Sequence, residues 1–371
     1  MVARVLVIGG YGNFGSYIAQ SLATDPSIRL LIGGRAEAKA QSFAAKLDGT
    51  NPAEGHAIDI EGNLALALTR ISPDIVVHTS GPFQRQDHRV ARACIAQGCH
   101  YLDLADARDF VASIGELDSA ARERGVIVVS GASSVPCLTA AVIDHYRPGF
   151  TRLDTIDYGI SAAQQTNRGL ATTSAVLSYV GKPLLRLRDG RMQRVFGWQD
   201  THAVRYPELG LRLFGNCDVP DLDLFPRRYS EVRDIRFAAG HELKVLHAGT
   251  WALGWLVRVG VVRSLDLHAE LLLKLALQFD RFGSGRSGFH MFLAGAGGDG
   301  RPRLVRFFII ARSGHGPYIP CMPAIILARR LARGEVGMRG ALPCLDLIKL
   351  DEYLAALKGL DISVIADPVD A

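Results

Sequence analysis

Residues 2–22 read VARVLVIGGYGNFGSYIAQSL, and this stretch decides the fold of the first half of the chain. Residues 5–8 form a short apolar run that is typical of a buried strand. Three apolar residues then recur with the spacing of one helix face: Phe14, Ile18 and Leu22. A glycine-rich turn joins the two segments. The order strand, glycine turn and helix predicts a dinucleotide-binding unit.

The three glycines of this turn have different expected roles. Gly10 permits the tight bend, Gly12 lets the backbone approach a pyrophosphate, and Gly15 allows the helix to pack closely on the strand. The amino end of the helix then presents unbonded N–H groups to the phosphates. The alternative is a Rossmann-like scaffold that binds no nucleotide.

The second strand, residues 28–34, ends where an acidic residue would accept the ribose hydroxyl of NAD. Gly34 and Arg35 occupy this position instead. A guanidinium pairs with a 2′-phosphate, which a carboxylate would repel, so NADP is favoured over NAD. The alternative is that Arg35 is the solvated start of a helix over residues 37–47.

Further strands alternate with helices over residues 55–132. The strand at 55–60 carries Asp59, which either bonds the adenine or caps the helix that begins at Asn63. The strand at 75–78 includes His78, which we interpret as a core histidine. It leads into the small-residue turn Ser80, Gly81, Pro82 and Phe83. This alternation predicts a doubly wound parallel sheet of the Rossmann type.

The second half of the chain has a different pattern, beginning near Pro148. Residues 153–161 alternate like a strand, and residues 289–311 form a hairpin around the turn at 297–300. We therefore expect a second α+β domain with a mainly antiparallel sheet that serves substrate binding or dimerisation. The expected division is 1–148 for the nucleotide domain, 149–312 for the second domain, and 313–371 for a segment that returns to the first.

Composition excludes several classes of protein. The net charge of +5 is spread without a basic block, which argues against nucleic-acid binding. The six cysteines show no zinc spacing, so no metal site is predicted, and we expect buried free thiols in a reducing compartment. The first strand follows Met1 directly, and Arg258 and Lys274 interrupt the most apolar stretches. We expect a cytoplasmic protein without a membrane partner.

Four separated strand ends match a known family in order. The segments are GGYGNFGSYIA at 9–19, GGR at 33–35, SGPFQRQDHRVARACIAQGCHYLDLADARDF at 80–110 and SGASSVPCLTAAVID at 130–144. Together they resemble the saccharopine dehydrogenase-like NADP-binding domain. The resemblance covers about the first 145 residues and is looser beyond them.

The resemblance implies NAD(P)-dependent hydride transfer at a carbon–nitrogen or related double bond. By position it assigns the pyrophosphate to Gly10, Gly12, Asn13, Phe14 and Gly15. It also assigns the 2′-phosphate to Arg35, and the nicotinamide side to the turn at 80–83. One departure is that SGASSVP lacks an acidic residue that some members carry between its glycine and proline, which argues against amino-acid substrates.

The absence of other motifs narrows the chemistry further. No Tyr is followed four residues later by Lys, and the sequence contains no GxSxG, no HExxH and no P-loop. Asp103, Ser134 and His315 are the candidates for substrate orientation or proton donation, although His315 also fits an ordinary surface histidine. We predict an NADP-dependent oxidoreductase that acts as a homodimer on an imine or other activated double bond of a small molecule.

Two alternatives remain open. The first is a trans-acting enoyl reductase for a lipid-like or carrier-bound substrate. Six phenylalanines of the second domain would suit such a substrate: Phe279, Phe282, Phe289, Phe292, Phe307 and Phe308. The second is a non-catalytic NADP-sensing protein. If the protein is an enzyme, the nicotinamide supplies the hydride, and the protein positions the nicotinamide and excludes water.

Overall fold

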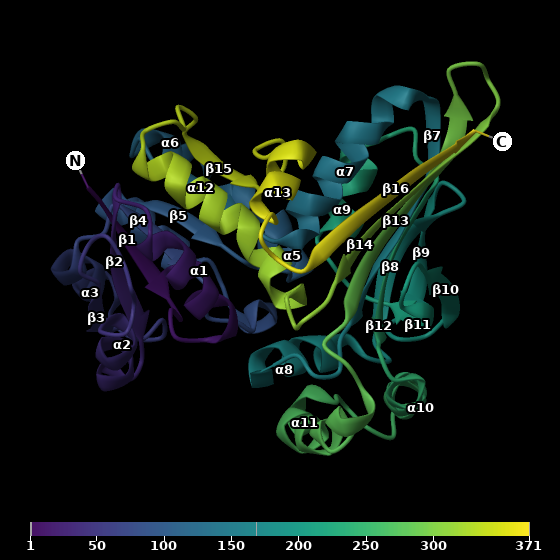
Figure 1. The fold of residues 1–371 in the computed structure, drawn as a ribbon, viewed down its shortest axis with the longest axis horizontal. Coiled ribbons are helices and arrows are strands. Elements are labelled where there is room, and N and C mark those ends of the chain that lie inside the picture. Colours follow the sequence, from purple (N-terminus) through teal and green to yellow (C-terminus); the bar gives the residue numbers. More distant parts are fainter. Residues whose placement is uncertain (1, 168, 371) are drawn as a thin grey trace. The chain divides into compact units, whose positions relative to one another are not determined.

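The computed structural model describes residues 2–167 and 169–370. The chain divides into two compact units (Figure 1). Unit 1 comprises Met1–Leu138 and Tyr318–Ala356, and unit 2 comprises Thr139–Pro317 and Leu357–Ala371. Each unit is built on its own large sheet, so each is described separately.

In the described chain, unit 1 holds a sheet of seven strands in the order β3-β2-β1-β4-β5-β6-β15. All neighbouring strands in it are parallel. The bounds are β1 (Ala3–Ile8), β2 (Ile28–Gly34), β3 (Glu54–Ala57), β4 (Ile75–His78), β5 (His100–Asp103), β6 (Ile127–Ser130) and β15 (Gly340–Pro343). The predicted Rossmann-type sheet is therefore confirmed, with β15 from the end of the chain as its seventh strand.

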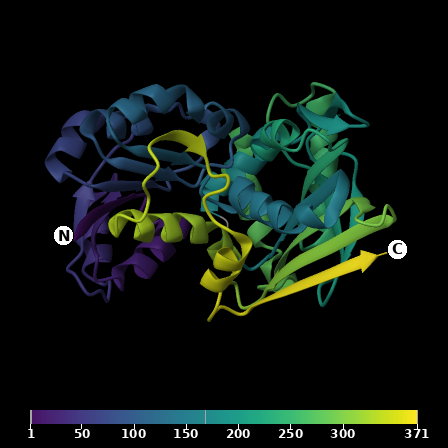
Figure 2. The same ribbon diagram turned by 90° about the horizontal axis from the view of Figure 1, so that it is seen from above.

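Helices cover both faces of the unit 1 sheet. The bounds are α1 (Asn13–Ala23), α2 (Glu37–Ala44), α3 (Leu64–Ile71), α4 (Arg89–Gln97), α5 (Arg108–Ala112), α6 (Asp118–Glu123), α12 (Met322–Ala332) and α13 (Leu350–Ala356). α1 and α12 lie side by side on one face (Figure 1 and Figure 2). On the other face, apolar residues of α3, α4 and α6 pack with those of the strands into one core, because their apolar residues share a helix face.

Unit 2 is built around a sheet in the order β10-β11-β12-β7-β13-β14-β16. The bounds are β7 (Phe150–Ala162), β10 (His202–Tyr206), β11 (Gly210–Asn216), β12 (Asp234–His241), β13 (Ser287–Gly297), β14 (Pro302–Ala311) and β16 (Ile362–Asp370). Only the β12–β7 pair is parallel among these neighbours. The predicted hairpin is confirmed as β13 and β14, and the sheet is mainly antiparallel as expected.

A separate hairpin and five helices complete the described part of unit 2. The hairpin pairs β8 (Pro183–Arg188) with β9 (Arg191–Phe196). The helices are α7 (Thr139–Tyr146), α8 (Gly169–Tyr179), α9 (Asp221–Arg228), α10 (Lys244–Arg258) and α11 (Ala269–Leu277).

The unit boundaries differ from the division expected from the sequence. α7 already belongs to unit 2, ten residues before the expected boundary near Pro148. Pro148 lies instead in the short 3-10 turn η4 (Arg147–Gly149) that leads into β7. The end of the chain also returns to unit 2, because β16 pairs with β14 along its whole length. Tyr318–Ala356, in contrast, joins unit 1.

Candidate functional site

The turn between β1 and α1 is tight because of Gly9. Gly9 has φ +81°, a left-handed conformation that favours glycine. Its N–H donates to the Gly33 carbonyl at 2.8 Å, and its own carbonyl accepts from the Gly12 N–H at 2.8 Å. Gly9 therefore supplies the left-handed residue of the bend that the sequence analysis had assigned to Gly10 alone. Gly10 is needed for close packing, since a Cβ there would lie 2.8 Å from the Val7 carbonyl oxygen.

Gly15 packs as the sequence suggests, and the approach of Gly12 to a pyrophosphate stays a prediction. A Cβ on Gly15 would overlap the Gly9 carbonyl, so this glycine lets α1 approach β1 closely. A Cβ on Gly12 would meet only the Gly9 carbonyl oxygen, at 3.1 Å. The outward side of Gly12 is therefore open to a ligand.

The amino end of α1 can receive an anion. Its cap residue is Gly12, which has no side chain to bond the first turn, and the first turn contains no acidic residue. Among the described residues, the N–H groups of Phe14 and Gly15 meet no acceptor. Asn13 opens the helix beside them. Unbonded N–H groups and an open glycine are what a pyrophosphate requires, so the turn fits a dinucleotide.

The end of β2 carries a cation and no acid. Arg35 is exposed, and it makes no ion pair or hydrogen bond with the residues that the structure describes. A Cβ on the preceding Gly34 would overlap the Tyr11 ring, so the ring lies against this glycine. The Tyr11 hydroxyl accepts a hydrogen bond from the Ala36 N–H at 3.3 Å. The sequence analysis missed Tyr11. Its position between Gly10 and Gly12 is the feature of the sequence that could have placed it in the nucleotide turn.

The loop after β4 packs against the glycine turn. The Thr79 hydroxyl donates to the Ile8 carbonyl at 2.9 Å. A Cβ on Gly9 would lie 2.8 Å from the Thr79 and Ser80 hydroxyl oxygens. Because β1 and β4 are neighbours from which the strand order runs in opposite directions, this is the switch point where α/β sheets bind ligands.

The turn predicted for the nicotinamide side has two different parts. The Gln86 amide donates to the Ser80 carbonyl at 2.6 Å and to the Pro82 carbonyl at 3.2 Å, which holds the turn around Gly81. Phe83 is buried instead, with its ring 5.0 Å from His78 and 5.3 Å from Phe110 between centroids. The Phe83 ring thus belongs to the core. Backbone contact of the turn with a nicotinamide stays a prediction.

Asp59 does not cap α3. The cap is Asn63, whose Oδ1 accepts from the Leu66 N–H at 3.0 Å, so the capping alternative for Asp59 is wrong. Asp59 lies two residues beyond β3, and its Oδ1 accepts from the Glu61 N–H at 3.1 Å. Its contact with an adenine stays a prediction.

Asp103 ends β5 and is completely buried. Its Oδ1 accepts from the N–H groups of Ala105 at 2.9 Å and Gly131 at 2.8 Å, and from the Ser130 hydroxyl at 3.0 Å. Burial raises the pKa of this carboxyl to about 6, while these donors act in the opposite direction. Asp103 therefore joins the carboxyl ends of β5 and β6.

His78 is a core residue, as expected. It is fully buried at the end of β4, and its Nδ1 lies 3.0 Å from the Tyr101 hydroxyl oxygen. Burial lowers the pKa of His78 to about 3, so the ring is neutral at physiological pH.

The other two catalytic candidates belong to different units. Ser134 begins the turn η3 (Ser134–Leu138) in unit 1 and is buried beside the Tyr353 phenol. His315 belongs to unit 2 and is half-buried, and its Nδ1 accepts from the Asp361 N–H at 2.8 Å. The structure therefore places Asp103 and Ser134 in one unit and His315 in the other.

A second buried acid, Asp221, was missed by the sequence analysis. It opens α9 in unit 2, and its Oδ2 accepts from the hydroxyls of Thr139 at 2.7 Å and Tyr158 at 2.9 Å. Burial raises the pKa of Asp221 to about 7, and the two hydroxyl donors limit the rise. The three residues are far apart in the chain, so no local sequence signal predicts this cluster.

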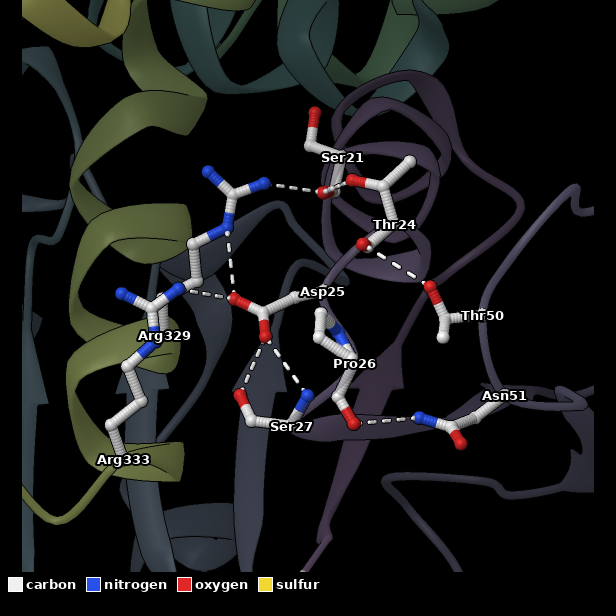
Figure 3. A network of polar contacts seen from close by, with 9 residues as sticks. All are labelled: Ser21, Thr24, Asp25, Pro26, Ser27, Thr50, Asn51, Arg329 and Arg333. Carbon is white, nitrogen blue, oxygen red and sulfur yellow. Dashed lines mark hydrogen bonds and ion pairs between the residues drawn. The ribbon is translucent and has the colours of Figure 1, made fainter.

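A polar network fastens α12 to the far end of α1 (Figure 3). Arg333 donates to Asp25 Oδ2 at 2.7 Å, and Arg329 donates to the Ser21 carbonyl at 2.6 Å. Asp25 also accepts from the hydroxyl of Ser27 at 2.6 Å through Oδ1. The helix that carries the glycine turn is therefore held by a segment from the end of the chain.

The fold and the glycine turn define an NAD(P)-dependent oxidoreductase. Residues 5–129 match the family model described as saccharopine dehydrogenase NADP binding domain. The match covers the part of the chain whose motifs indicated this domain, and it supports a saccharopine dehydrogenase-like NADP-binding domain over these residues. No curated protein matches the chain in a sequence search.

Solved structures share the fold at low sequence identity. Apo saccharopine dehydrogenase (L-Glu forming) from Saccharomyces cerevisiae superimposes with a TM-score of 0.69 at 12% identity, over 98% of this chain and 100% of that chain. Amine dehydrogenase from Mycobacterium smegmatis gives a TM-score of 0.49 at 13% identity, over 95% of this chain and 96% of that chain. The likeness to the yeast enzyme shows a common two-unit fold.

Proposed function

We propose that the protein transfers a hydride between NADP(H) and an imine or other activated double bond of a small molecule. One end of the unit 1 sheet carries this proposal. The loop after β1 offers the N–H groups of Phe14 and Gly15 and the open side of Gly12. The next βα loop offers Arg35, which has no partner among the described residues. When bound, the nicotinamide supplies the hydride. The chain's own residues bind and orient it.

The preference for NADP over NAD rests on the loop after β2. Arg35 and Ala36 follow β2 directly, so this loop offers a guanidinium and no carboxylate. The Tyr11 ring lies against Gly34 and fixes the path of the chain before Arg35. A 2′-phosphate would pair with the guanidinium, whose charge has no partner among the described residues.

The three catalytic candidates have different proposed roles. His315 is the candidate proton donor, because its Nδ1 accepts a backbone N–H and the neutral ring then carries its proton on Nε2. Ser134 is the candidate for substrate orientation. Asp103 has no solvent exposure, and its hydrogen bonds to Ala105 and Gly131 make it a positioning residue for the loops after β5 and β6.

The enoyl reductase alternative loses part of its support. Of the six phenylalanines that suggested a lipid-like substrate, Phe289, Phe307 and Phe308 are core residues with at most 6% exposure. The NADP-sensing alternative requires only the nucleotide site, so it predicts nucleotide binding without turnover of imines or enoyl compounds. A cytoplasmic location and a homodimer remain our predictions. Light scattering measures the oligomeric state.

Calorimetric titration with NADPH and separately with NADH tests the proposal. We expect Arg35→Ala to weaken NADPH binding by about 1.5–3 kcal/mol, the usual contribution of a hydrogen bond to a charged group, and to leave NADH binding unchanged. Arg70→Ala is the matched control, because Arg70 is another exposed arginine of unit 1 without a partner among the described residues. Equal binding of the two nucleotides by the wild type would refute the NADP preference.

A further inference from the structure

Helix α10 presents apolar residues on the side that faces solvent. Its inward side is anchored by His247 and Gly254, which are buried. On its outward side Val245 is 60% exposed, and Val259, the C-cap residue that follows the helix, is 64% exposed. A surface helix of a soluble protein normally carries polar residues on that side. α10 therefore presents apolar side chains on the side that the described structure leaves uncovered.

The segment after α10, residues 259–282, also exposes large apolar side chains. Val261, Leu267, Leu271 and Phe282 are each at least 58% exposed, over the stretch that includes α11. α10 and α11 contribute residues to the same apolar cluster around Trp198. We call the outward side of residues 245–282 the apolar face. A surface of this kind marks an interaction site.

The charges along α10 are positive. The rest of the apolar face is balanced, with three bases and three acids: Arg263, Lys274, Arg281, Asp266, Glu270 and Asp280. Residues 244–263 contain Lys244, Arg258 and Arg263 and no acidic residue. In α11, Lys274 pairs with Glu270 at 2.8 Å, which leaves that helix nearly neutral. The face thus combines exposed apolar side chains with uncompensated cations along α10.

Aromatic side chains stand beside these cations. Trp251 is 40% exposed and Trp255 is 39% exposed, with their rings edge to face at 6.3 Å. The Arg258 guanidinium lies 4.5 Å from the centroid of the Trp255 ring. Tryptophan and arginine together are typical of helices that lie at the boundary between lipid headgroups and acyl chains.

We propose that unit 2 docks through the apolar face onto an anionic lipid surface. Anionic headgroups would neutralise the cations along α10, and Trp251, Trp255 and Arg258 would lie at the level of the headgroups. In the described part of the chain no helix is long and apolar enough to cross a membrane. In this proposal α10 and α11 lie in the interface plane. This partner differs from the sequence expectation, which considered only spanning segments, and it does not depend on the nucleotide chemistry.

Co-sedimentation with vesicles tests the docking. The full chain is mixed with vesicles of phosphatidylcholine that contain or lack phosphatidylserine. We expect binding to the anionic vesicles only, weakened by added salt, together with a blue shift of tryptophan fluorescence from Trp251 and Trp255. Absence of binding, or equal binding to both vesicles, would overturn the proposal.

A matched pair of variants separates the apolar face from general hydrophobicity. Val259→Asp combined with Leu271→Asp is expected to reduce the partition coefficient at least tenfold. Leu66→Asp is the control, because Leu66 is a 66% exposed leucine on α3 of unit 1, and it should leave partitioning unchanged. NADPH titration and circular dichroism check that each variant is folded.

Light scattering without vesicles tests the competing occupant. If the apolar face were a contact between two copies, the double variant would convert a dimer into a monomer, and lipid composition would have no effect. That result would overturn the lipid proposal. An unchanged oligomeric state in the double variant supports it.

Discussion

Asp103 in unit 1 and Asp221 in unit 2 are both completely buried carboxyls with raised pKa values, but their surroundings differ. Asp103 accepts two backbone N–H groups and one hydroxyl on Oδ1. Asp221 accepts two side-chain hydroxyls on Oδ2. In both acids the other carboxyl oxygen has no partner among the described residues. The pKa of Asp103 rises to about 6 and that of Asp221 to about 7.

The comparison separates two uses of a buried acid. Backbone N–H groups cannot rotate away, so removing the Asp103 acceptor leaves them unsatisfied in the core. The hydroxyls around Asp221 can rotate toward other acceptors and therefore depend less on the carboxylate. We infer that Asp103 fixes the two loops at the nucleotide end of unit 1. Asp221 is instead a titratable group inside unit 2.

The largest effect is expected at Asp103. Asp103→Ala leaves the N–H groups of Ala105 and Gly131 and the Ser130 hydroxyl without their acceptor, and should lower the free energy of unfolding by about 3–5 kcal/mol. Asp103→Asn keeps an oxygen at the Oδ1 position and should cost less than half as much. Urea denaturation of both variants measures the difference. Equal losses would show that charge, and not the acceptor, is what matters at this position.

The next effect concerns the pH dependence that Asp221 confers. Its folded-state pKa lies near 7, above the ordinary value, so the protonated form stabilises the fold below about pH 4 and this contribution is lost as pH rises through about 7. In the wild type the free energy of unfolding falls over this pH range, and we expect the fall to be about 1–3 kcal/mol smaller in Asp221→Asn. Denaturation at several pH values measures the slope.

A contradicting outcome is equally clear. If the wild type and Asp221→Asn lose stability in parallel as pH rises, Asp221 does not titrate in this range. The difference between the two aspartates would then be one of hydrogen-bond geometry alone.

The contrast between the two units also explains how much of the fold the sequence predicts. β1, the glycine turn and α1 follow from a local pattern, and so does the β13–β14 hairpin with its turn at Gly297–Gly300. β16 was missed because its pairing with β14 joins residues about sixty positions apart, without a turn between them. α7 was assigned to the first domain because Pro148 resembled a boundary, whereas tertiary packing decides its unit.

The candidate site shows the same limit. Gly12, Gly15 and Arg35 were found because a motif fixes their spacing. Gly9 was passed over, since only φ distinguishes it from Gly10. Of the partners of Asp103, Ala105 is local, but Ser130 and Gly131 lie 27 and 28 residues away at the end of the next strand. Those of Asp221 lie 63 and 82 residues away, so the burial and hydrogen bonding of both acids depend on the completed fold.

A smaller effect is expected when one hydroxyl around Asp221 is removed. Tyr158→Phe deletes one of the two donors to Oδ2 and should cost about 1–1.5 kcal/mol of unfolding free energy. The pKa of Asp221 should rise further, because a donor that stabilises the carboxylate is lost. Thr139→Val removes the other donor and is a second test of the same effect. If neither variant moves the pH at which stability falls, the hydroxyls do not set this pKa.

The smallest effect on the free energy of unfolding is expected at Asp25, and its pH dependence runs opposite to that of Asp221. Burial opposes its ionisation, but hydrogen bonds from Ser27 and Arg333 hold the pKa of Asp25 below its ordinary value. The stabilisation from this carboxylate is therefore present above about pH 4 and is lost as pH falls, the reverse of Asp221. Because Arg333 is half-exposed, Asp25→Asn should cost only about 0.5–1 kcal/mol at neutral pH and nothing in acid. Denaturation at neutral and acidic pH measures this, and Arg70→Ala, which breaks no contact with described residues, is the control. A loss that persists in acid would mean that the hydrogen bonds to Ser27, and not the charge shared with α12, hold the end of α1 in place.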